Sequence, residues 1–172
     1  MVLATHSDAG FHNESKARGR DVSHIFLSEE KPDPRCNGLI LTIAQVINFF
    51  MCSAVEAEVG AIFITAKELL PIRQALIETG CTHPPTPIQL DNSTESSVAN
   101  DTIIVRKNKS MDLRLHLLRC CESQQQFRFY WAPGSKNWAN YSTKHHLPIY
   151  HESKRPLFTG TVQKLYQALL AQ

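Results

Sequence analysis

The sequence predicts a single α/β domain, and three observations support this fold class. First, three runs rich in β-branched or aromatic residues indicate strands at an antiparallel start. These runs span residues 3–8, 24–28 and 39–43. Second, a long segment with apolar residues at helical spacing begins after Ser53. Third, strand-like runs at 87–91 and 127–131 alternate with helical segments. The 172 residues suit one domain, which would bury about 68–70% of the surface of its unfolded chain.

The first strand and the long helix have boundary signals in the sequence. The strand is expected to end in a turn at Gly10. Ser53 is expected to cap the helix, because Ser53-Ala-Val-Glu56 matches a capping box in which the hydroxyl and the glutamate each satisfy a free backbone amide. Pro71 is expected to end this helix and to begin the next, which Gly80 closes.

The second half of the chain is expected to continue with shorter elements. The strand at 87–91 stops at an acid, and residues 92–95 resemble a helix cap directly behind it. Ser110 is expected to cap a further helix, and a short helix is expected near Asn137, after a Pro133-Gly134 turn.

The chain divides by character near residue 146. Residues 1–146 are expected to form the folded domain, and 147–172 a linker and a C-terminal amphipathic helix. The Pro- and His-bearing linker covers 145–156 in this interpretation, and the helix covers 161–172.

The two halves of the chain differ in charge. Through Asp101 there are 13 acidic and 7 basic residues, whereas from Thr102 onward there are 3 acidic and 11 basic residues. Because phosphates bind Lys and Arg while metal ions bind carboxylates, this asymmetry suits a polyanion-binding face beside an acidic centre. Two ordinary solvated faces explain it equally well.

The five cysteines and the N-terminus argue against several protein classes. The cysteines form no CxxC pair and are odd in number, so the sequence indicates neither a zinc site nor a disulfide framework. The N-terminus has no apolar signal-peptide core, and no stretch is long and apolar enough for a membrane span. An intracellular protein of the cytoplasm or nucleus, without a membrane partner, is the expectation.

Three acidic residues stand where polar groups from distant parts of an α/β chain converge. Asp8 and Asp91 each stand at the end of a predicted strand. Residues two apart on a helix point about 200° apart, so Glu56 and Glu58 cannot both face the sheet. Glu58 lies within about 40° of Ile62 on the apolar side, where an acid is costly unless it is paired or binds a metal. Glu58 is therefore the candidate ligand.

Three converging carboxylates would bind a hard cation such as Mg²⁺. Two such ions about 4 Å apart can activate a water and stabilise the leaving oxygen in phosphodiester cleavage. Each acid also has an ordinary alternative, since Asp8 could be a turn residue and Asp91 could belong to a helix cap. It is their order and setting together that favour the metal site.

Several segments of the chain resemble the ribonuclease H domain at the end of copia-type retrotransposon polyproteins, over residues 3–146. The segments are His-Ser-Asp8-Ala, Cys-Ser-Ala-Val-Glu-Ala-Glu58, Ile-Gln-Leu-Asp91-Asn, Lys109-Ser-Met-Asp112 and Ala-Asn140-Tyr-Ser-Thr-Lys144. The resemblance implies a mixed five-strand sheet, three antiparallel strands and then two parallel ones, flanked by helices. It also implies hydrolysis of the RNA strand of an RNA–DNA hybrid, with a reverse transcriptase domain as a partner.

The resemblance further implies two Mg²⁺ ions, for which Mn²⁺ can substitute. Asp8 would bridge both ions, Glu58 and Asp91 would complete the second, and a fourth residue would help to bind the first. That fourth position is usually aspartate, but here it is Asn140. An amide oxygen still ligates a hard cation, but it lacks the charge that lowers the pKa of bound water. Weakened cleavage is therefore expected.

The alternative is an inactive module that keeps the fold and binds nucleic acid or protein. Asn140 departs from the family pattern, and so does the segment Lys109-Ser-Met, where the family often has Lys-His-Ile. These departures fit a degenerate or domesticated copy as well as a working enzyme.

Basic residues near the acidic segments are candidates for nucleic-acid contacts. They are Arg106, Lys107, Lys109 and Lys144. A solvated basic loop explains them about as well. Trp138 could stack on a base or sugar, although an aromatic residue in a short helix is more often part of the core.

Overall fold

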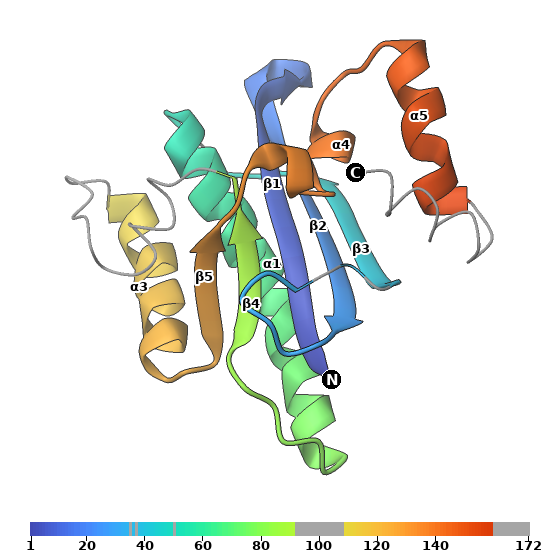
Figure 1. The fold of residues 1–172 in the computed structure, drawn as a ribbon. Helices are drawn as coiled ribbons and strands as arrows, with labels where there is room; N and C mark the ends of the chain where they lie inside the picture. Colours follow the sequence, from blue (N-terminus) through green and yellow to red (C-terminus); the bar gives the residue numbers. More distant parts are fainter. Residues whose placement is uncertain (35, 37, 50, 92–108, 160–172) are drawn as a thin grey trace.

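A five-stranded sheet in the order β3-β2-β1-β4-β5 forms the centre of the molecule (Figure 1). The structure is a computed structural model that describes residues 1–34, 36, 38–49, 51–91 and 109–159. The strands are β1 (Val2–Glu14), β2 (Arg18–Ser28), β3 (Leu39–Val46), β4 (Thr86–Leu90) and β5 (Phe127–Trp131). Strands β1, β2 and β3 pair antiparallel, whereas β4 is parallel to β1 and to β5. The predicted mixed sheet is confirmed.

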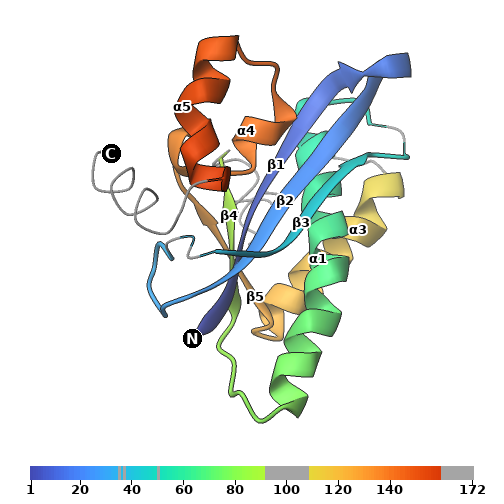
Figure 2. The ribbon, with the colours of Figure 1, turned by 90° about the vertical axis from the view of Figure 1, so that its right-hand side faces the viewer.

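Helices lie on both sides of this sheet. They are α1 (Ala54–Glu78), α3 (Lys109–Ser123), α4 (Asn140–Thr143) and α5 (Pro148–Thr159), with short 3₁₀ turns η1 (Ser15–Ala17) and η2 (Gly134–Lys136). Helices α1 and α3 cover one face, and α4 and α5 lie on the other side (Figure 2). The main apolar core fills the space between the sheet, α1 and α3, and its largest fully buried members are Leu3, Ile25, Ile62, Leu69, Ile88, Leu90, Leu118 and Phe127.

The prediction of a turn at Gly10 is wrong, because β1 continues to Glu14. Gly10 pairs with Arg20 of β2, and the register then shifts before Glu14 pairs with Arg18. The reversal occurs at η1, where Lys16 and Ala17 have positive φ angles. Cross-strand pairing over many residues outweighs the local turn preference of one glycine.

The predicted cap of α1 is confirmed. Ser53 Oγ accepts a hydrogen bond from Glu56 N at 3.2 Å, and Glu56 Oε2 reaches back to Cys52 N at 2.7 Å. At the other end Gly80, with φ +87°, donates to the Ile77 carbonyl, while Cys81 donates to the Leu76 carbonyl. This is the Schellman pattern that a glycine after a helix favours.

The prediction that Pro71 ends the first helix is wrong. Helix α1 runs through Pro71 as one continuous helix. A proline inside a helix costs about 3 kcal/mol through its missing hydrogen bond and its ring. The residues beyond it more than offset this cost, because Ile72 and Leu76 pack on the core and the Arg73 guanidinium donates to the Pro84 and His83 carbonyls.

The predicted linker after residue 144 is also wrong, since Pro148–Thr159 forms helix α5. An aromatic cluster attaches α5 to α4. Tyr141 Oη and His151 Nδ1 lie 2.7 Å apart, and the His146 ring stacks on Tyr141 and on Tyr150. No signal within the segment itself announces these contacts. The division of the chain at residue 146 stays a prediction.

Strands β2 and β3 are longer than their predicted runs of 24–28 and 39–43, since β2 begins at Arg18 and β3 ends at Val46. The other elements differ from prediction by small shifts. Helix α3 begins one residue before Ser110, and helix α4 begins at Asn140 after the η2 turn. The predicted cap at 92–95 and the predicted helix at 161–172 lie outside the described residues. Of the helices in the described ranges, none is both long enough and apolar enough to cross a membrane.

Candidate metal centre

The register of the two central parallel strands places Asp8 beside Asp91. In the parallel pairing of β1 with β4, His6 lies opposite Gln89. Asp8 and Asp91 each come two residues later, so their side chains project on the same face as this pair. Strand β4 ends at Leu90, and Asp91 therefore stands at the tip of its strand.

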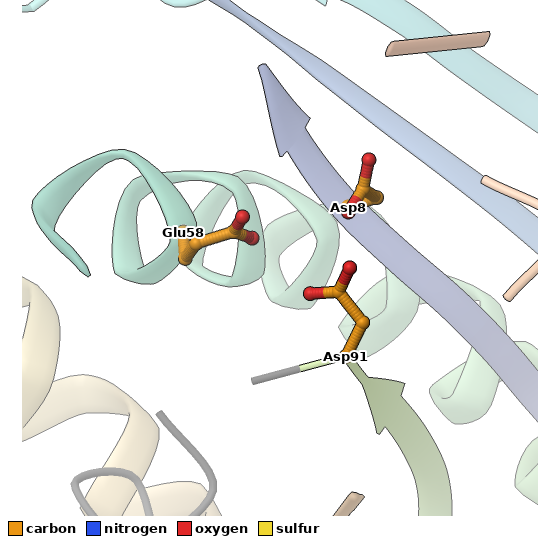
Figure 3. Close-up of side chains that lie close together, drawn as sticks. All are labelled: Asp8, Glu58 and Asp91. Atoms are coloured by element: carbon orange, nitrogen blue, oxygen red, sulfur yellow. The ribbon is translucent and has the colours of Figure 1, made fainter. Parts of the chain in front are cut away.

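Helix α1 brings Glu58 to the same place. Ligand oxygens of Asp8, Glu58 and Asp91 all lie within 4.8 Å of one another, and Figure 3 shows the three carboxylates turned toward a common point. Glu58 follows the confirmed cap at Ser53 by about one and a half turns. The predicted convergence of these three segments, which are far apart in sequence, is what the structure has.

Asp8 is the buried member of this group. Its side chain is only 1% exposed, while Glu58 and Asp91 are partly exposed. The pKa of Asp8 is raised to about 7, mainly by burial and also by the neighbouring Asp91 carboxylate, whereas a hydrogen bond from Thr143 and the charge of Lys144 act in the opposite direction. A carboxylate in this setting is stabilised in its ionised form by any cation that binds between the three acids.

The donor set fits a hard divalent cation. Three carboxylates from a strand, a strand tip and a helix offer oxygens only, which is the chemistry that Mg²⁺ prefers. Because two of the acids are partly exposed, water and a phosphate can reach the remaining coordination positions. Asp8, Glu58 and Asp91 are therefore the residues that would hold the metal.

Helix α4 borders this centre and carries Asn140. Asn140 Nδ2 donates to the Gly134 carbonyl at 3.2 Å, and Asn140 Oδ1 accepts a hydrogen bond from Lys144 Nζ. A Cβ atom added to Gly134 would lie 3.2 Å from Asp91 Oδ2 and 3.6 Å from Asn140 Nδ2. Asp91 and Asn140 therefore both lie close to Gly134, and the absence of a side chain at this glycine leaves room for them.

Sequence reasoning missed the role of Thr143. Its hydroxyl donates to Asp8 Oδ2, and its carbonyl accepts from Asn13 Nδ2 at 2.6 Å. These two bonds join α4 to β1 across about 130 residues of sequence. The only available signal was spacing, because residues three apart on a helix share a face and Thr143 is three residues after Asn140.

The structure describes only some of the residues predicted to contact nucleic acid. Arg106 and Lys107 lie outside the described residues, and Lys109 begins α3 with its side chain undescribed. Lys144 lies at the metal centre through its bond to Asn140. Trp138 packs against the buried cluster of Ala4, Phe26 and Cys36 on the face of the sheet away from α1, which supports the core interpretation of this residue.

Replacing Thr143 with Val is expected to lower the free energy of unfolding by about 1–3 kcal/mol at pH 8 without metal. Valine has nearly the shape of threonine but no hydroxyl, so the buried Asp8 carboxylate loses a hydrogen-bond donor. The loss should be smaller at pH 5, where the Asp8 carboxyl is protonated. Urea denaturation in EDTA measures both values. A loss no greater than that of Ser142→Ala, in the same helix, would contradict the assigned hydrogen bond.

Solved structures of ribonucleases H share this architecture. The chain is similar to LC11-RNase H1, isolated from compost by a metagenomic approach, with a TM-score of 0.59 at 12% identity over 82% of this chain and 91% of that one. The same enzyme in complex with an RNA/DNA hybrid gives a TM-score of 0.59 at 11% identity, over 82% and 92% of the two chains.

A third structure gives the same result. The N-terminal RNase H domain of rv2228c from Mycobacterium tuberculosis, as a fusion with maltose binding protein, matches with a TM-score of 0.56 at 10% identity, over 83% of this chain and 95% of that one. No protein-family model and no curated protein sequence matches the chain. At such low identities the likeness shows the fold, which is RNase H-like.

Proposed function

We propose that this chain is a metal-dependent endonuclease that hydrolyses the RNA strand of RNA–DNA hybrids. The observation that carries the proposal is the convergence of Asp8, Glu58 and Asp91 within 4.8 Å, in an RNase H-like fold. The similar structure with a bound RNA/DNA hybrid supports this choice of substrate. Mg²⁺ is the proposed cofactor, with Mn²⁺ as a substitute. It would supply Lewis acidity and a water of lowered pKa when bound.

The chain's own groups have defined tasks in this proposal. Asp8 offers the buried carboxylate at the centre, and Thr143 fixes its orientation through a hydrogen bond. Glu58 and Asp91 complete the ligand set from the partly exposed side, where the substrate would approach. Arg106, Lys107 and Lys109 are proposed phosphate contacts, since Lys and Arg supply most of the affinity for nucleic acid.

The origin and setting of the chain belong to the same proposal. The segments around Asp8, Glu58 and Asp91 support descent from a copia-type retrotransposon polyprotein, in which a reverse transcriptase domain would be the partner. All five cysteines are free thiols, which is in keeping with an intracellular location in the cytoplasm or nucleus.

Asn140 favours a second candidate, a catalytically inactive module that binds nucleic acid or protein. Its amide is engaged on both sides, by the Gly134 carbonyl and by Lys144. A carboxylate at this position could not donate to Gly134, so the local structure is adapted to an amide. Such adaptation is what a centre that has lost selection for a fourth acidic ligand would show.

A cleavage assay separates the two candidates. A hybrid labelled in its RNA strand is incubated with the native chain and with Asn140→Asp in Mg²⁺, in Mn²⁺ and in EDTA, beside double-stranded RNA and DNA of the same sequence. Cleavage of the hybrid RNA by the native chain, stopped by EDTA, supports the nuclease. If both chains bind the hybrid and neither cuts it, the inactive module is correct. Cleavage by Asn140→Asp alone identifies a disabled nuclease.

A further inference from the structure

A lysine ammonium lies at the edge of the acidic centre. Asn140 and Thr143 are three residues apart in the single turn of α4, which places them on one side of it, and Lys144 is the extended residue directly after this turn. Thr143 donates to Asp8, and Lys144 Nζ donates to Asn140 Oδ1. The C-terminal end of α4 therefore brings a hydroxyl to one acid and a positive charge beside it.

The hydrogen bonds of Asn140 fix which way its amide points. Its nitrogen faces the Gly134 carbonyl at 3.2 Å, so its oxygen must face the other way, toward the Lys144 ammonium. That oxygen is the only side-chain atom of Asn140 that could ligate a cation. In this arrangement the ammonium, and not a metal ion, occupies the position in front of it.

Charge balance points in the same direction. The three carboxylates carry three negative charges when all are ionised. One divalent ion together with one ammonium supplies three positive charges and neutralises them. A second divalent ion would add two positive charges next to Lys144. The ammonium would repel this ion at short range, and the group of three contains no further carboxylate to offset the repulsion. The positive charge of Lys144 already acts on Asp8, whose pKa it lowers against the effect of burial.

We propose that the Lys144 ammonium is a resident cation of this centre, and that the centre consequently binds one divalent ion, held by Asp8, Glu58 and Asp91. The inference rests on the proposed function and changes the number of ions that the family resemblance implies from two to one. Lys144 then provides a positive charge beside the reacting phosphate, on the Asn140 side of the centre, in addition to any contact with the substrate backbone.

Binding of Mn²⁺ alone tests this proposal. Calorimetry gives the number of ions per chain, and electron paramagnetic resonance distinguishes a single Mn²⁺ from a spin-coupled pair. The native chain is expected to bind one ion with an uncoupled spectrum. Lys144→Met removes a like charge and should bind the ion roughly tenfold more tightly. The double variant Asn140→Asp/Lys144→Met should bind a coupled pair.

Lys67→Met is the matched control. Lys67 is an exposed lysine of α1, nine residues and therefore roughly 13 Å along the helix from Glu58, and its ammonium lies over the Phe63 ring. This variant should bind Mn²⁺ as the native chain does. Two ions per native chain, or a Lys144→Met chain that binds Mn²⁺ like Lys67→Met, would overturn the proposal. The native stoichiometry decides the matter even if the double variant does not fold.

The outcome is distinguishable from failure of the proposed function. A native chain that cuts the hybrid and binds two ions is a nuclease with the usual pair, and only the role of Lys144 is then wrong. If one ion binds, with the expected effect of Lys144→Met, but no hybrid is cut, the inference about the centre stands and the nuclease proposal fails. A chain that binds no Mn²⁺ overturns both.

Discussion

Asp8→Asn is expected to lower the rate of hybrid cleavage by at least about 100-fold in saturating Mg²⁺. A catalytic metal ion contributes several kcal/mol to transition-state stabilisation, and each 1.36 kcal/mol corresponds to about tenfold in rate. The substitution preserves the shape of the side chain but removes the charge of the one fully buried ligand of the centre. Single-turnover cleavage of a labelled hybrid measures the effect.

Asp21 provides a matched control for this experiment. It is a 0% exposed carboxylate of β2, and it pairs with Ala9, so it projects on the face of the sheet opposite to Asp8. Its side chain bonds with Ser23 and not with the acidic centre. Asp21→Asn should change the cleavage rate by no more than about twofold, provided that the chain is folded. Equal rate losses in both variants would show that burial, and not metal binding, explains the effect of Asp8.

The second large effect is a pH-dependent stability difference between the native chain and Asp8→Asn in the absence of metal. The pKa of Asp8 is raised to about 7 in the folded chain from the ordinary aspartate value of 3.8, which applies to the unfolded chain. Between these values the folded chain retains a proton that the unfolded chain releases, so rising pH favours unfolding. The native chain should therefore lose up to about 4 kcal/mol relative to Asp8→Asn between pH 4 and pH 8.

A difference between variants is needed because His6, His24 and His83, whose pKa values burial lowers, act in the opposite sense. Burial lowers the pKa of His6 to about 3 and that of His24 to about 4. Their unfolded forms bind protons at acidic pH that the folded chain does not, so their contribution to stability grows as the pH rises toward 6.5. These contributions are present in both chains and cancel in the difference.

Urea denaturation at pH 4, 6 and 8 in EDTA measures this difference, and a repeat in Mg²⁺ shows how much of it the metal removes. Mg²⁺ binds the ionised carboxylates, so it should restore the stability of the native chain at pH 8. The corresponding difference for Asp21→Asn, whose pKa burial also raises to about 7, should not respond to Mg²⁺. A stability difference for Asp8→Asn that is flat with pH, or insensitive to Mg²⁺, would count against the assigned environment.

Much of the fold follows from local sequence signals. Strand β5 has the predicted bounds, and the Ser53 cap and the Gly80 terminus of α1 form as predicted, because alternation and capping depend on neighbouring residues. The failures at Gly10, Pro71 and α5 share one cause. In each case contacts outside the element itself stabilise a structure that its own residues disfavour or do not encode, and for α5 these contacts are with the neighbouring α4.

The candidate centre shows the same division. Asp91 could be selected as a strand end and Glu58 from helix geometry, because these rules fix where a side chain points. Asp8 is also predicted at a strand end, but it lies inside β1, which continues to Glu14. Thr143 and Lys144 could not be given their places in this way. Their positions depend on how the turn of α4 packs against β1, more than a hundred residues away in sequence.

The central claim is that Asp8, Glu58 and Asp91 together hold a divalent cation, and anomalous diffraction from crystals soaked in Mn²⁺ tests it most directly. The account predicts an anomalous peak between the three carboxylates, at roughly 2.0–2.3 Å from an oxygen of each, with water in the remaining positions. At a saturating Mn²⁺ concentration, density that shows the three side chains without a peak between them would contradict the account.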